Sequence, residues 1–588
     1  ANILKVICPL FLDDLKAELK KIGKNDKKLF AFQQKLASLQ FFDPACGCGN
    51  FLVIAYRELR LLEMEVIEAI YGKSLSGQLN VDTLILCNVH QFHGIEIDPS
   101  AAQIATVALW LTDHQMNLRV QRFGNYYSRI PLVKKANIIC GNALQIDWND
   151  VLPAKQCGFV MGNPPFIGAK YMTAEQRADI EPIFKPLKNG GLLDYVAAWY
   201  VKAASFIQNN PKAPVAFVST NSITQGEQVG VLWPYLFAHG IKIHFAHRTF
   251  RWSNEGRGVA AVHCVIVGFG LGDTAAKTLY EYEDINGGPT VLSAKHINPY
   301  LVDAPDVTLT NRKTPLCDVP EIGIGNKPID GGHYLFTPEE KDAFLTHEPQ
   351  AAKWFRRWIG ADEFINGYER WCLWLGDCPP NELRQMPEAM KRVESVRKTR
   401  LASKSAPTQK LAATPTRFHV ENIPDAPYLV IPEVSSERRQ FIPVGFMQPD
   451  TLSSNLVRIL PHATLYHFGI LTSTMHNAWM RTVCGRLKSD YRYSVGIVYN
   501  NFPWPTLTDK QGAAIEAAGQ AVLDARAQFP GSTLADLYDP LAMPPELVKA
   551  HAELDKAVDA AYGYKGKKDD AARVAFLFGL YQNIVNED

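Results

Sequence analysis

The chain has 588 residues, more than the roughly 250–300 that one hydrophobic core serves, so the length predicts two or more domains. Hydrophobic residues make up 47% of the chain and charged residues 21%, which is typical of globular proteins and excludes wholesale disorder. The 61 basic and 60 acidic residues leave a net charge of +1, so any surface for a polyanion must be local.

No apolar run approaches the length of about 18 residues that a membrane helix needs, so we expect no membrane partner. The 11 cysteines are odd in number, and no two pairs of them stand at zinc-ligand spacing. We therefore expect a cytoplasmic protein without a structural metal.

Up to about residue 270, short apolar runs that end in Gly, Asp or Asn alternate with longer helical patterns. The expected strands lie at 39–43, 91–97, 136–141, 157–165, 214–220, 241–247 and 260–269. The expected helices carry apolar residues at i, i+3 and i+4 and lie at 51–71, 99–114, 195–208 and 226–239. We predict an α/β domain over 41–270 with a doubly wound, seven-stranded, Rossmann-like sheet, preceded by a helical segment over 1–40.

After residue 270, proline and glycine become frequent and the strand patterns become short, which predicts a second, mixed α+β domain over 271–509. Within it, the segment 384–417 holds nine basic and two acidic residues, a net charge of +7. This segment is either a set of phosphate contacts or a solvated loop. Alanine-rich amphipathic patterns then predict a helical C-terminal region over 510–588.

Two strings follow the first two expected strands. DPACGCGNF at 43–51 has glycines that let the backbone approach a ligand at the carboxyl edge of a parallel sheet, and its GxG spacing disfavours a dinucleotide. Alone, it also fits a tight strand-to-helix turn. GIEID at 94–98 ends the next strand with a carboxylate, which can accept hydrogen bonds from ribose hydroxyls.

The decisive string is GNPPF at 162–166, directly after an apolar strand. Two consecutive prolines stiffen the loop, so the Asn163 side-chain oxygen and the Pro164 carbonyl can point outward as fixed acceptors. Two acceptors beside an aromatic face suit a planar exocyclic amine. An Asn-Pro turn with Phe166 in the core is the alternative for this string in isolation.

These three strings resemble those of the amino-methylating DNA methyltransferases that use S-adenosylmethionine, in the order of the gamma class. GNPPFIGAKYM, SSERRQFIP at 435–443 and SDYRYSVGIVYNNFPWP at 489–505 are similar, more closely, to the MmeI-like type IIL restriction-modification enzymes. The resemblance extends over nearly the whole chain. It implies a methyltransferase domain followed by a target-recognition domain that binds double-stranded DNA.

The resemblance also implies roles for single residues in binding S-adenosylmethionine. The methionine end would be lined by Asp43, Ala45, Cys46, Gly47 and Gly49. Glu96 would hold the ribose, and Ile97 would pack on the adenine ring. At 142 the family usually carries an acid that accepts from the adenine amine, whereas this chain has Asn142.

For the target base, the resemblance implies that Asn163 Oδ1 and Pro164 O bind the amine while Phe166 stacks on the flipped base. Phe250 matches the second stacking aromatic of the family, with neighbouring Trp252 and plain core packing as alternatives. An Asn at the head of the tetrapeptide favours adenine N6 over cytosine N4.

Candidates for base readout in the second domain rest on local resemblance and are Glu437, Arg438, Arg439, Lys488, Asp490 and Arg492. We find no convincing D…ExK nuclease pattern, and the first residues look like the middle of the family's N-terminal cofactor motif. We therefore expect a fragment whose parent protein carries an upstream nuclease domain. A protein glutamine methyltransferase and a non-catalytic DNA-binding specificity subunit are the alternatives.

Overall fold

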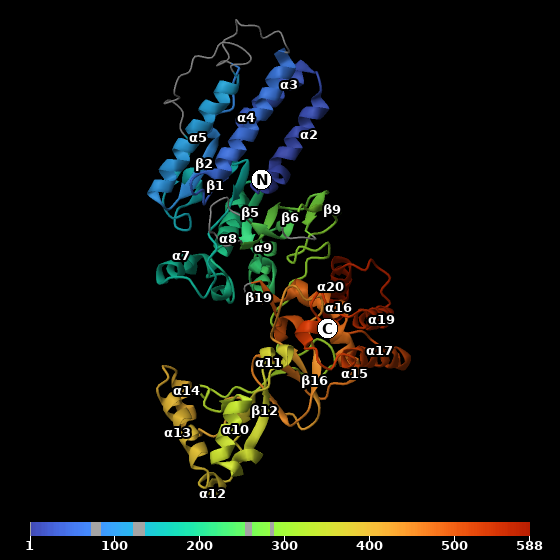
Figure 1. The fold of residues 1–588 in the computed structure, drawn as a ribbon. Coiled ribbons are helices and arrows are strands. Elements are labelled where there is room, and N and C mark those ends of the chain that lie inside the picture. Colours follow the sequence, from blue (N-terminus) through green and yellow to red (C-terminus); the bar gives the residue numbers. More distant parts are fainter. Residues whose placement is uncertain are drawn as a thin grey trace. The chain divides into compact units, whose positions relative to one another are not determined.

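The computed structural model describes residues 2–71, 84–120, 136–252, 262–282, 287–487 and 489–587. The chain forms two compact units, which we call unit 1 (Ala1–Thr308) and unit 2 (Leu309–Asp588) (Figure 1). Unit 1 extends past residue 270, where the sequence predicts the second domain to begin. Unit 2 contains both the region predicted as mixed α+β and the helical C-terminal region.

In its described residues, unit 1 is an α/β unit with one mixed sheet of nine strands in the order β3-β2-β1-β4-β5-β7-β6-β8-β9. The strands are β1 (Phe41–Asp43), β2 (Phe92–Glu96), β3 (Asn137–Cys140), β4 (Phe159–Gly162), β5 (Val215–Thr220), β6 (Ile241–Trp252), β7 (Val262–Leu271), β8 (Lys277–Glu281) and β9 (Thr290–Ala294). The first five strands in this order are parallel, and β7 is antiparallel to both of its neighbours.

The number of strands differs from the predicted seven because β8 pairs in parallel with β6, and β9 pairs with β8. These two strands lie in the stretch that the sequence assigns to the second domain. The seven predicted strands are all present, so the predicted α/β class is confirmed, and the additional pair extends one edge of the sheet.

Side chains of β1 show that both faces of the sheet are covered. The Phe41 ring lies 4.8 Å from the Phe92 ring and 5.0 Å from the Phe11 ring, on one face. The next residue, Phe42, points to the other face, where its ring lies 5.4 Å from that of Trp148 and 5.8 Å from that of Phe206. Alternate residues of a buried parallel strand thus serve two hydrophobic layers.

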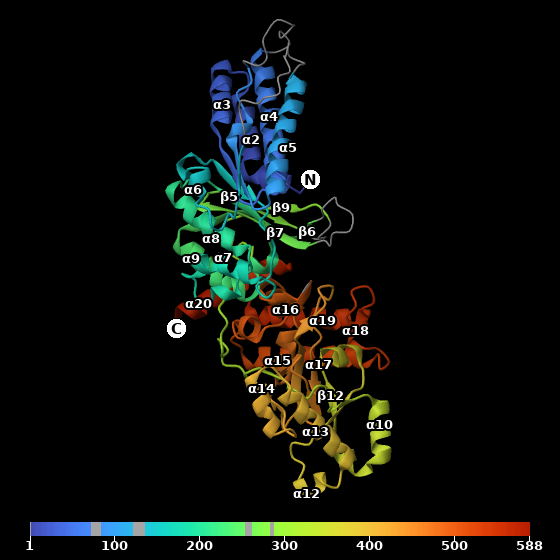
Figure 2. The same cartoon turned by 90° about the vertical axis from the view of Figure 1, so that its left-hand side faces the viewer.

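The helices of unit 1 are α1 (Leu4–Ile7), α2 (Asp13–Ile22), α3 (Asp26–Ser38), α4 (Asn50–Tyr71), α5 (Pro99–Val120), α6 (Trp148–Val151), α7 (Ala174–Phe184), α8 (Ala197–Phe206) and α9 (Val229–Ala238). Helices α2 to α5 lie side by side in both views (Figures 1 and 2). None of the helices in the described ranges is both long and apolar enough to cross a membrane.

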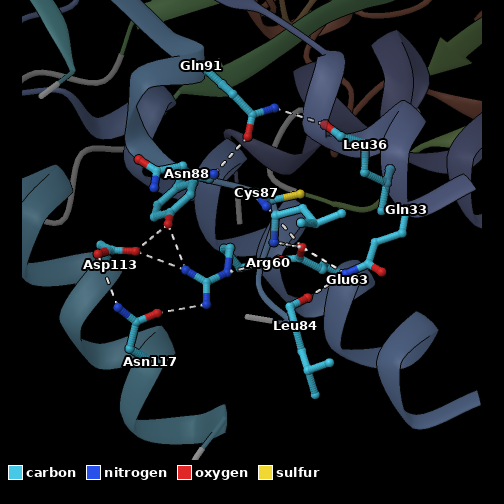
Figure 3. Close-up of polar contacts among 12 residues, drawn as sticks. Gln33, Leu36, Arg60, Glu63, Leu84, Cys87, Asn88, Gln91, Asp113 and Asn117 are labelled. Carbon is cyan, nitrogen blue, oxygen red and sulfur yellow. Dashed lines mark hydrogen bonds and ion pairs between the residues drawn. The ribbon is translucent and has the colours of Figure 1, made fainter. Parts of the chain in front are cut away.

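A buried polar network fixes α4 against its neighbours (Figure 3). The Arg60 guanidinium donates to Asp113 Oδ1 at 2.9 Å and to Asn117 Oδ1 at 2.8 Å, both on α5. One turn along α4, Glu63 Oε1 accepts from the Leu86 and Cys87 backbone N–H groups at 2.6 and 2.9 Å. Because the charges are paired and hydrogen-bonded, burial of this network is tolerated. It fixes the helix that begins directly after the DPACGCG loop.

Unit 2 contains three small sheets, with strand orders β10-β18-β14-β16, β11-β13-β12-β17 and β15-β20-β19. Their strands are β10 (Gly323–Ile324), β11 (Leu335–Phe336), β12 (Phe355–Ile359), β13 (Trp371–Leu373), β14 (Tyr428–Pro432), β15 (Val434–Ser435), β16 (Gly445–Met447), β17 (Thr451–Ser453), β18 (Val457–Leu460), β19 (Gly485–Leu487) and β20 (Asp490–Arg492). The short, irregular strands match the predicted α+β character.

Helices complete unit 2 and dominate its C-terminal part. They are α10 (Pro338–His347), α11 (Ala361–Asn366), α12 (Pro380–Leu383), α13 (Pro387–Leu401), α14 (Ala406–Lys410), α15 (Leu465–Thr472), α16 (Thr474–Val483), α17 (Asp509–Ala527), α18 (Leu534–Leu537), α19 (Pro545–Tyr562) and α20 (Asp570–Glu587). The side chain of Arg526 on α17 donates to the Val444 carbonyl at 2.6 Å, so the C-terminal helices pack directly on the part before them.

Candidate active site

Four loops of unit 1 follow the parallel strands β1, β2, β3 and β4, which are neighbours in the sheet. Because the carboxyl ends of parallel strands meet at one edge, the loops lie together there. They span 44–49, 97–98, 141–147 and 163–173. All residues predicted to bind the cofactor, and three of the four predicted to bind the base, belong to these loops or to the strand ends before them.

The first loop turns tightly and uses glycine where other residues would not fit. Gly47 and Gly49 have φ angles of +53° and +82°, which L side chains rarely adopt. A Cβ on Gly49 would also lie 3.0 Å from the Ala105 Cβ of α5. The backbone of Gly94 on β2 approaches Cys46 so closely that a Cβ there would lie 2.9 Å from the Cys46 sulfur. The loop is therefore held close to both α5 and β2.

Asp43 ends β1 as a buried carboxylate with one free oxygen. Its Oδ1 accepts a hydrogen bond from the Ala45 N–H at 3.0 Å, and its buried Oδ2 has no hydrogen-bond partner. The pKa of Asp43 is raised to about 7, mainly by burial, with the Ala45 hydrogen bond opposing the shift and the nearby Glu96 charge adding to it. A buried acceptor of this kind is the feature that a cationic ligand would satisfy.

Glu96 bridges two loops at the end of β2. Its Oε2 accepts from the Gly47 N–H at 2.8 Å and its Oε1 accepts from the Asp98 N–H at 2.9 Å. The carboxylate thus ties the first loop to the second, and each oxygen has further lone pairs for a ligand. The next residue, Ile97, is 64% exposed, a large fraction for an isoleucine side chain beside a glycine-rich loop.

Asn142 lies in the turn after β3. Its side-chain Oδ1 accepts from the Leu144 N–H at 2.9 Å, and its carbonyl accepts from the Gln145 and Ile146 N–H groups, each at 3.0 Å. The turn joins the neighbouring strand end through the Gly141 N–H, which donates to the Glu96 carbonyl at 2.8 Å. The amide oxygen predicted to accept from a ligand is therefore already engaged in shaping the turn.

The tetrapeptide Asn163–Phe166 follows β4, directly beside the loop after β1. Asn163 Oδ1 is buried and has no hydrogen-bond partner. Pro164 is buried, and the half-buried Phe166 ring packs against the main hydrophobic core of unit 1. The site thus contains two unsatisfied buried acceptors, Asp43 Oδ2 and Asn163 Oδ1, on neighbouring strands.

Phe250 lies on β6 and is fully buried. Its ring stacks on that of Tyr282 at a centroid distance of 5.2 Å, and the Lys5 ammonium lies 4.2 Å from its centroid. The ring therefore has no exposed face in this structure, as in the core-packing alternative. The side chain of Trp252, the competing aromatic, lies outside the described part of the chain.

The sequence analysis missed three residues that hold the loops from behind. Asp194, Trp199 and Lys202 lie at or just before α8, and each hydrogen-bonds to the backbone of a different loop. Their only signal in the sequence is the presence of polar and aromatic residues in an otherwise apolar helix. Such a signal does not reveal a partner that lies many residues away.

Of the residues predicted to read bases, Asp490 and Arg492 lie on β20, and Glu437, Arg438 and Arg439 follow β15 of the same small sheet. The Glu437 N–H donates to Asp490 Oδ1 at 3.3 Å, and the Arg492 guanidinium donates to Glu433 Oε1 at 2.9 Å. Arg438 is exposed and Arg439 is half-buried, with its pKa lowered by burial. Lys488 lies outside the described residues.

The basic segment 384–417 contains α13 and α14, and its basic side chains differ in their exposure. Arg400 is fully buried, and its guanidinium donates to five backbone carbonyls, those of Pro328, Ile329, Leu411, Thr414 and Arg417. It therefore organises the loops around α13 and is not accessible to a phosphate. Within the described ranges, no cluster of three or more His, Cys, Asp or Glu side chains could hold a metal ion.

Comparison with protein families matches the whole order of domains. Residues 19–281 match the DNA-methyltransferase domain of MmeI, residues 303–506 match its target recognition domain, and residues 507–587 match its C-terminal domain. The first of these ranges includes β8, which agrees with the extension of the sheet beyond residue 270.

Individual relatives give the same result. The chain is 40% identical over 587 residues to DNA methyltransferase A of Bacillus subtilis (strain 168), covering 99% of this chain and 66% of that protein. A solved structure of the type IIL restriction-modification enzyme MmeI in complex with DNA superposes with a TM-score of 0.90 at 56% identity, covering all of this chain and 78% of that one. The chain thus spans about two thirds of the curated relative. It belongs to the MmeI family of type IIL restriction-modification proteins, with the methyltransferase, target-recognition and C-terminal domains in that order.

Proposed function

We propose that this chain methylates the exocyclic N6 amine of adenine in double-stranded DNA, using S-adenosylmethionine, as the modification and specificity part of a restriction-modification enzyme. The observation that carries the proposal is the buried, unpartnered Asn163 Oδ1, which lies beside a second unpartnered acceptor, Asp43 Oδ2. Buried polar atoms without partners are rare in native folds and are expected where a ligand completes the site.

The first two loops fit S-adenosylmethionine on three counts. The free Asp43 oxygen is suited to the ammonium of the methionine end, whose positive charge would keep the carboxylate ionised. A Cβ on Gly47 would meet no atom within 4 Å, so the backbone beside Ala45 and Cys46 is open to a ligand at that residue. The exposed Ile97 side chain offers a flat apolar contact for an adenine ring, next to Glu96, whose oxygens retain lone pairs for the ribose hydroxyls.

When bound, S-adenosylmethionine supplies a methyl group on a positively charged sulfur. The chain's task is to orient the attacking nitrogen. Asn163 Oδ1 and the Pro164 carbonyl would each accept one amine hydrogen and draw the nitrogen out of conjugation with the ring, so that its lone pair becomes available. Such catalysis by positioning needs no general base with a perturbed pKa.

A base inside a duplex cannot reach these acceptors, so the target must leave the stack. Phe166 directly follows the two prolines and is half-buried, so part of its ring remains available to stack on the extruded base. Phe250 would contribute only after leaving its buried contacts with Tyr282 and Lys5. We therefore assign the stacking role to Phe166 first.

Unit 2 would select the DNA sequence. The exposed basic side chains of α13 and α14 would contact phosphates, whereas Glu437, Arg438, Arg439, Lys488, Asp490 and Arg492 would read base edges. The match of residues 303–506 to a target recognition domain supports this division.

Transfer of a labelled methyl group to pools of duplex oligonucleotides tests the proposal. We expect label in N6-methyladenine at one position of a defined sequence, identified after digestion to nucleosides. Label in N4-methylcytosine would contradict the assignment of the base. Absence of label from DNA, with cofactor bound normally, would favour a specificity subunit without catalysis.

A further inference from the structure

One short stretch of chain, Asp194 to Lys202, contacts three of the four loops of the site. Lys202 reaches the loop after β3, Trp199 reaches the loop after β1, and Asp194 reaches the loop after β4. The stretch comprises the turn before α8 and the first half of that helix. We call it the α8 brace.

Lys202 makes the most concentrated of these contacts. Its ammonium donates to the carbonyls of Ala143 at 2.7 Å, Leu144 at 3.2 Å and Ile146 at 2.6 Å. An ammonium has three donors and no acceptor, so these three carbonyls use its whole capacity. The indole N–H of Trp148 donates to the Ala143 carbonyl as well, at 2.9 Å. The turn that carries Asn142 is thus held through its backbone from one side.

Lys202 is held where its charge is costly. It lines a pocket of about 460 Å³ together with Gln145 and Asp179, and it is only partly exposed. Burial lowers the pKa of Lys202 to about 8, and the charge of Asp147 opposes the shift. Asp179, an acid that lines this pocket, accepts a hydrogen bond from Gln145 Nε2 at 2.7 Å. The three carbonyl hydrogen bonds offset the cost of burying the Lys202 ammonium, which indicates that this side chain holds the turn in place.

Asp194 makes the corresponding contacts at the other end of the brace. Its Oδ1 accepts from the Ala169 N–H at 2.9 Å, and its Oδ2 accepts from the Ser222 hydroxyl at 2.6 Å. The next residue adds a backbone bond, from the Tyr195 N–H to the Ile167 carbonyl at 2.9 Å. These contacts fix the loop directly after Asn163–Phe166.

Trp199, in the middle of the α8 brace, contacts the loop after β1. The indole N–H of Trp199 donates to the Pro44 carbonyl at 3.1 Å, in a buried position, directly after Asp43. Successive turns of one helix therefore set the relative positions of the loop after β1 and the loop after β3. A rigid helix transmits these positions better than the loops themselves, which contain several glycines.

We propose that the α8 brace positions the site, with Lys202 setting the affinity for the cofactor through the Asn142 turn and Asp194 setting turnover through the Asn163 loop. This inference rests on the proposed function, since it assigns the two loops to cofactor and target base. Neither residue needs to touch a ligand, so both are positioning residues. We therefore expect a change at Lys202 to alter cofactor affinity and a change at Asp194 to alter kcat.

The test compares three variants of the full chain, Lys202→Met, Asp194→Ala and the control Lys277→Met. Lys277 is also a buried lysine, but it lies on β8 and pairs with Asp273 at 2.6 Å, away from the four loops. Calorimetric titration with S-adenosylhomocysteine should show at least tenfold weaker binding for Lys202→Met. Asp194→Ala should bind it within about twofold of wild type, yet lose at least tenfold in kcat. The control should change neither quantity.

The pH dependence gives an independent readout of Lys202. Between pH 7 and pH 9 the wild-type ammonium loses its proton and one donor, so the affinity for S-adenosylhomocysteine should fall severalfold. Lys202→Arg keeps its charge throughout this range and should flatten the dependence. Asp147 and Asp179 face Lys202, and Asp43, with a pKa of about 7, titrates in both proteins, so the readout is the difference between the pH profiles of wild type and Lys202→Arg.

A third readout needs no cofactor. The Leu144, Gln145 and Ile146 amides all donate to Asn142, so their hydrogen exchange reports on the turn. Lys202→Met should accelerate exchange there and leave the amides of β7 unchanged. Unchanged exchange at 144–146, or equal losses of affinity and kcat in both variants, would overturn the inference. If the wild-type protein binds no S-adenosylhomocysteine, the proposed function is wrong. The hydrogen-exchange experiment then still tests whether Lys202 holds the Asn142 turn.

Discussion

The Asp43 carboxylate lies directly against the Cα of Gly162, so that a Cβ built on Gly162 would stand 2.6 Å from Asp43 Oδ1. The residue that ends the first strand of the site and the residue that precedes Asn163 are therefore in van der Waals contact. The two unsatisfied acceptors of the site, Asp43 Oδ2 and Asn163 Oδ1, belong to this pair of adjoining strand ends.

Gly162→Ala tests this contact. The added methyl group has no room beside Asp43, so either the carboxylate or the Asn163 backbone must shift, at a cost of about 1–3 kcal/mol in stability. We expect methyl transfer to fall by at least tenfold in initial-rate assays. Gly191→Ala is a suitable control, because a Cβ at Gly191 meets no atom within 4 Å. Wild-type rates in Gly162→Ala would show that the contact is unimportant.

Asn163→Ala removes the acceptor proposed to act mainly as the amine changes geometry. We expect methyl transfer to be lost while the dissociation constant for specific duplex DNA stays within about threefold of wild type. Labelled methyl transfer and fluorescence anisotropy measure the two quantities. Near-normal turnover would remove Asn163 from the reaction.

Phe166→Ala should impair the methylation of an intact duplex more than that of a duplex with a mismatched target adenine. A mispaired adenine costs less to extrude, so it depends less on the stacking contact that Phe166 would provide. Single-turnover rates on both substrates give the comparison. Equal losses would speak against a role in base extrusion.

Glu96→Ala should weaken cofactor binding about tenfold or more, because charge-assisted hydrogen bonds to ribose contribute on the order of 1.5–3 kcal/mol. The variant also loses the acceptor for the Gly47 N–H, which holds the first loop. Glu96→Gln separates the two effects, since it keeps a neutral acceptor for that N–H. If calorimetry shows unchanged cofactor affinity in both variants, Glu96 is only a solvated residue at the end of β2 and does not bind the ribose.

Asp43 gives the ligand-free protein a pH dependence of known sign. Its pKa is about 7 in the fold against about 3.8 for a free aspartate, so the folded state holds a proton that the unfolded chain releases. This contribution to stability is full below about pH 4 and is lost as the pH rises to about 7, by at most about 1.4 kcal/mol per pH unit. Urea unfolding of Asp43→Asn should lack this component. Parallel pH profiles of both proteins would contradict the raised pKa.

The strand pattern predicts β1 to β7, and the three strings predict which strand ends meet at one edge of the sheet. Sequence patterns are insufficient where tertiary contacts decide the position of a strand or a side chain. β8 was assigned to the second domain because proline and glycine are frequent around it, yet pairing with β6 places it in the first sheet. Arg400 counted as a phosphate contact by its charge, although five carbonyls bury it. Lys202 gave no signal because its partners are backbone atoms more than 50 residues away.

The α8 brace binds mainly the backbone of the loops, and this determines which substitutions in the loops the site can tolerate. Lys202 and Trp199 bind main-chain carbonyls, and Asp194 binds a main-chain N–H, so none of the three depends on which side chains the loops carry. Loop side chains that do not themselves shape a turn can therefore be exchanged without loss of these backbone contacts. Engineered variants of the loops should be tolerated wherever the turn itself is kept.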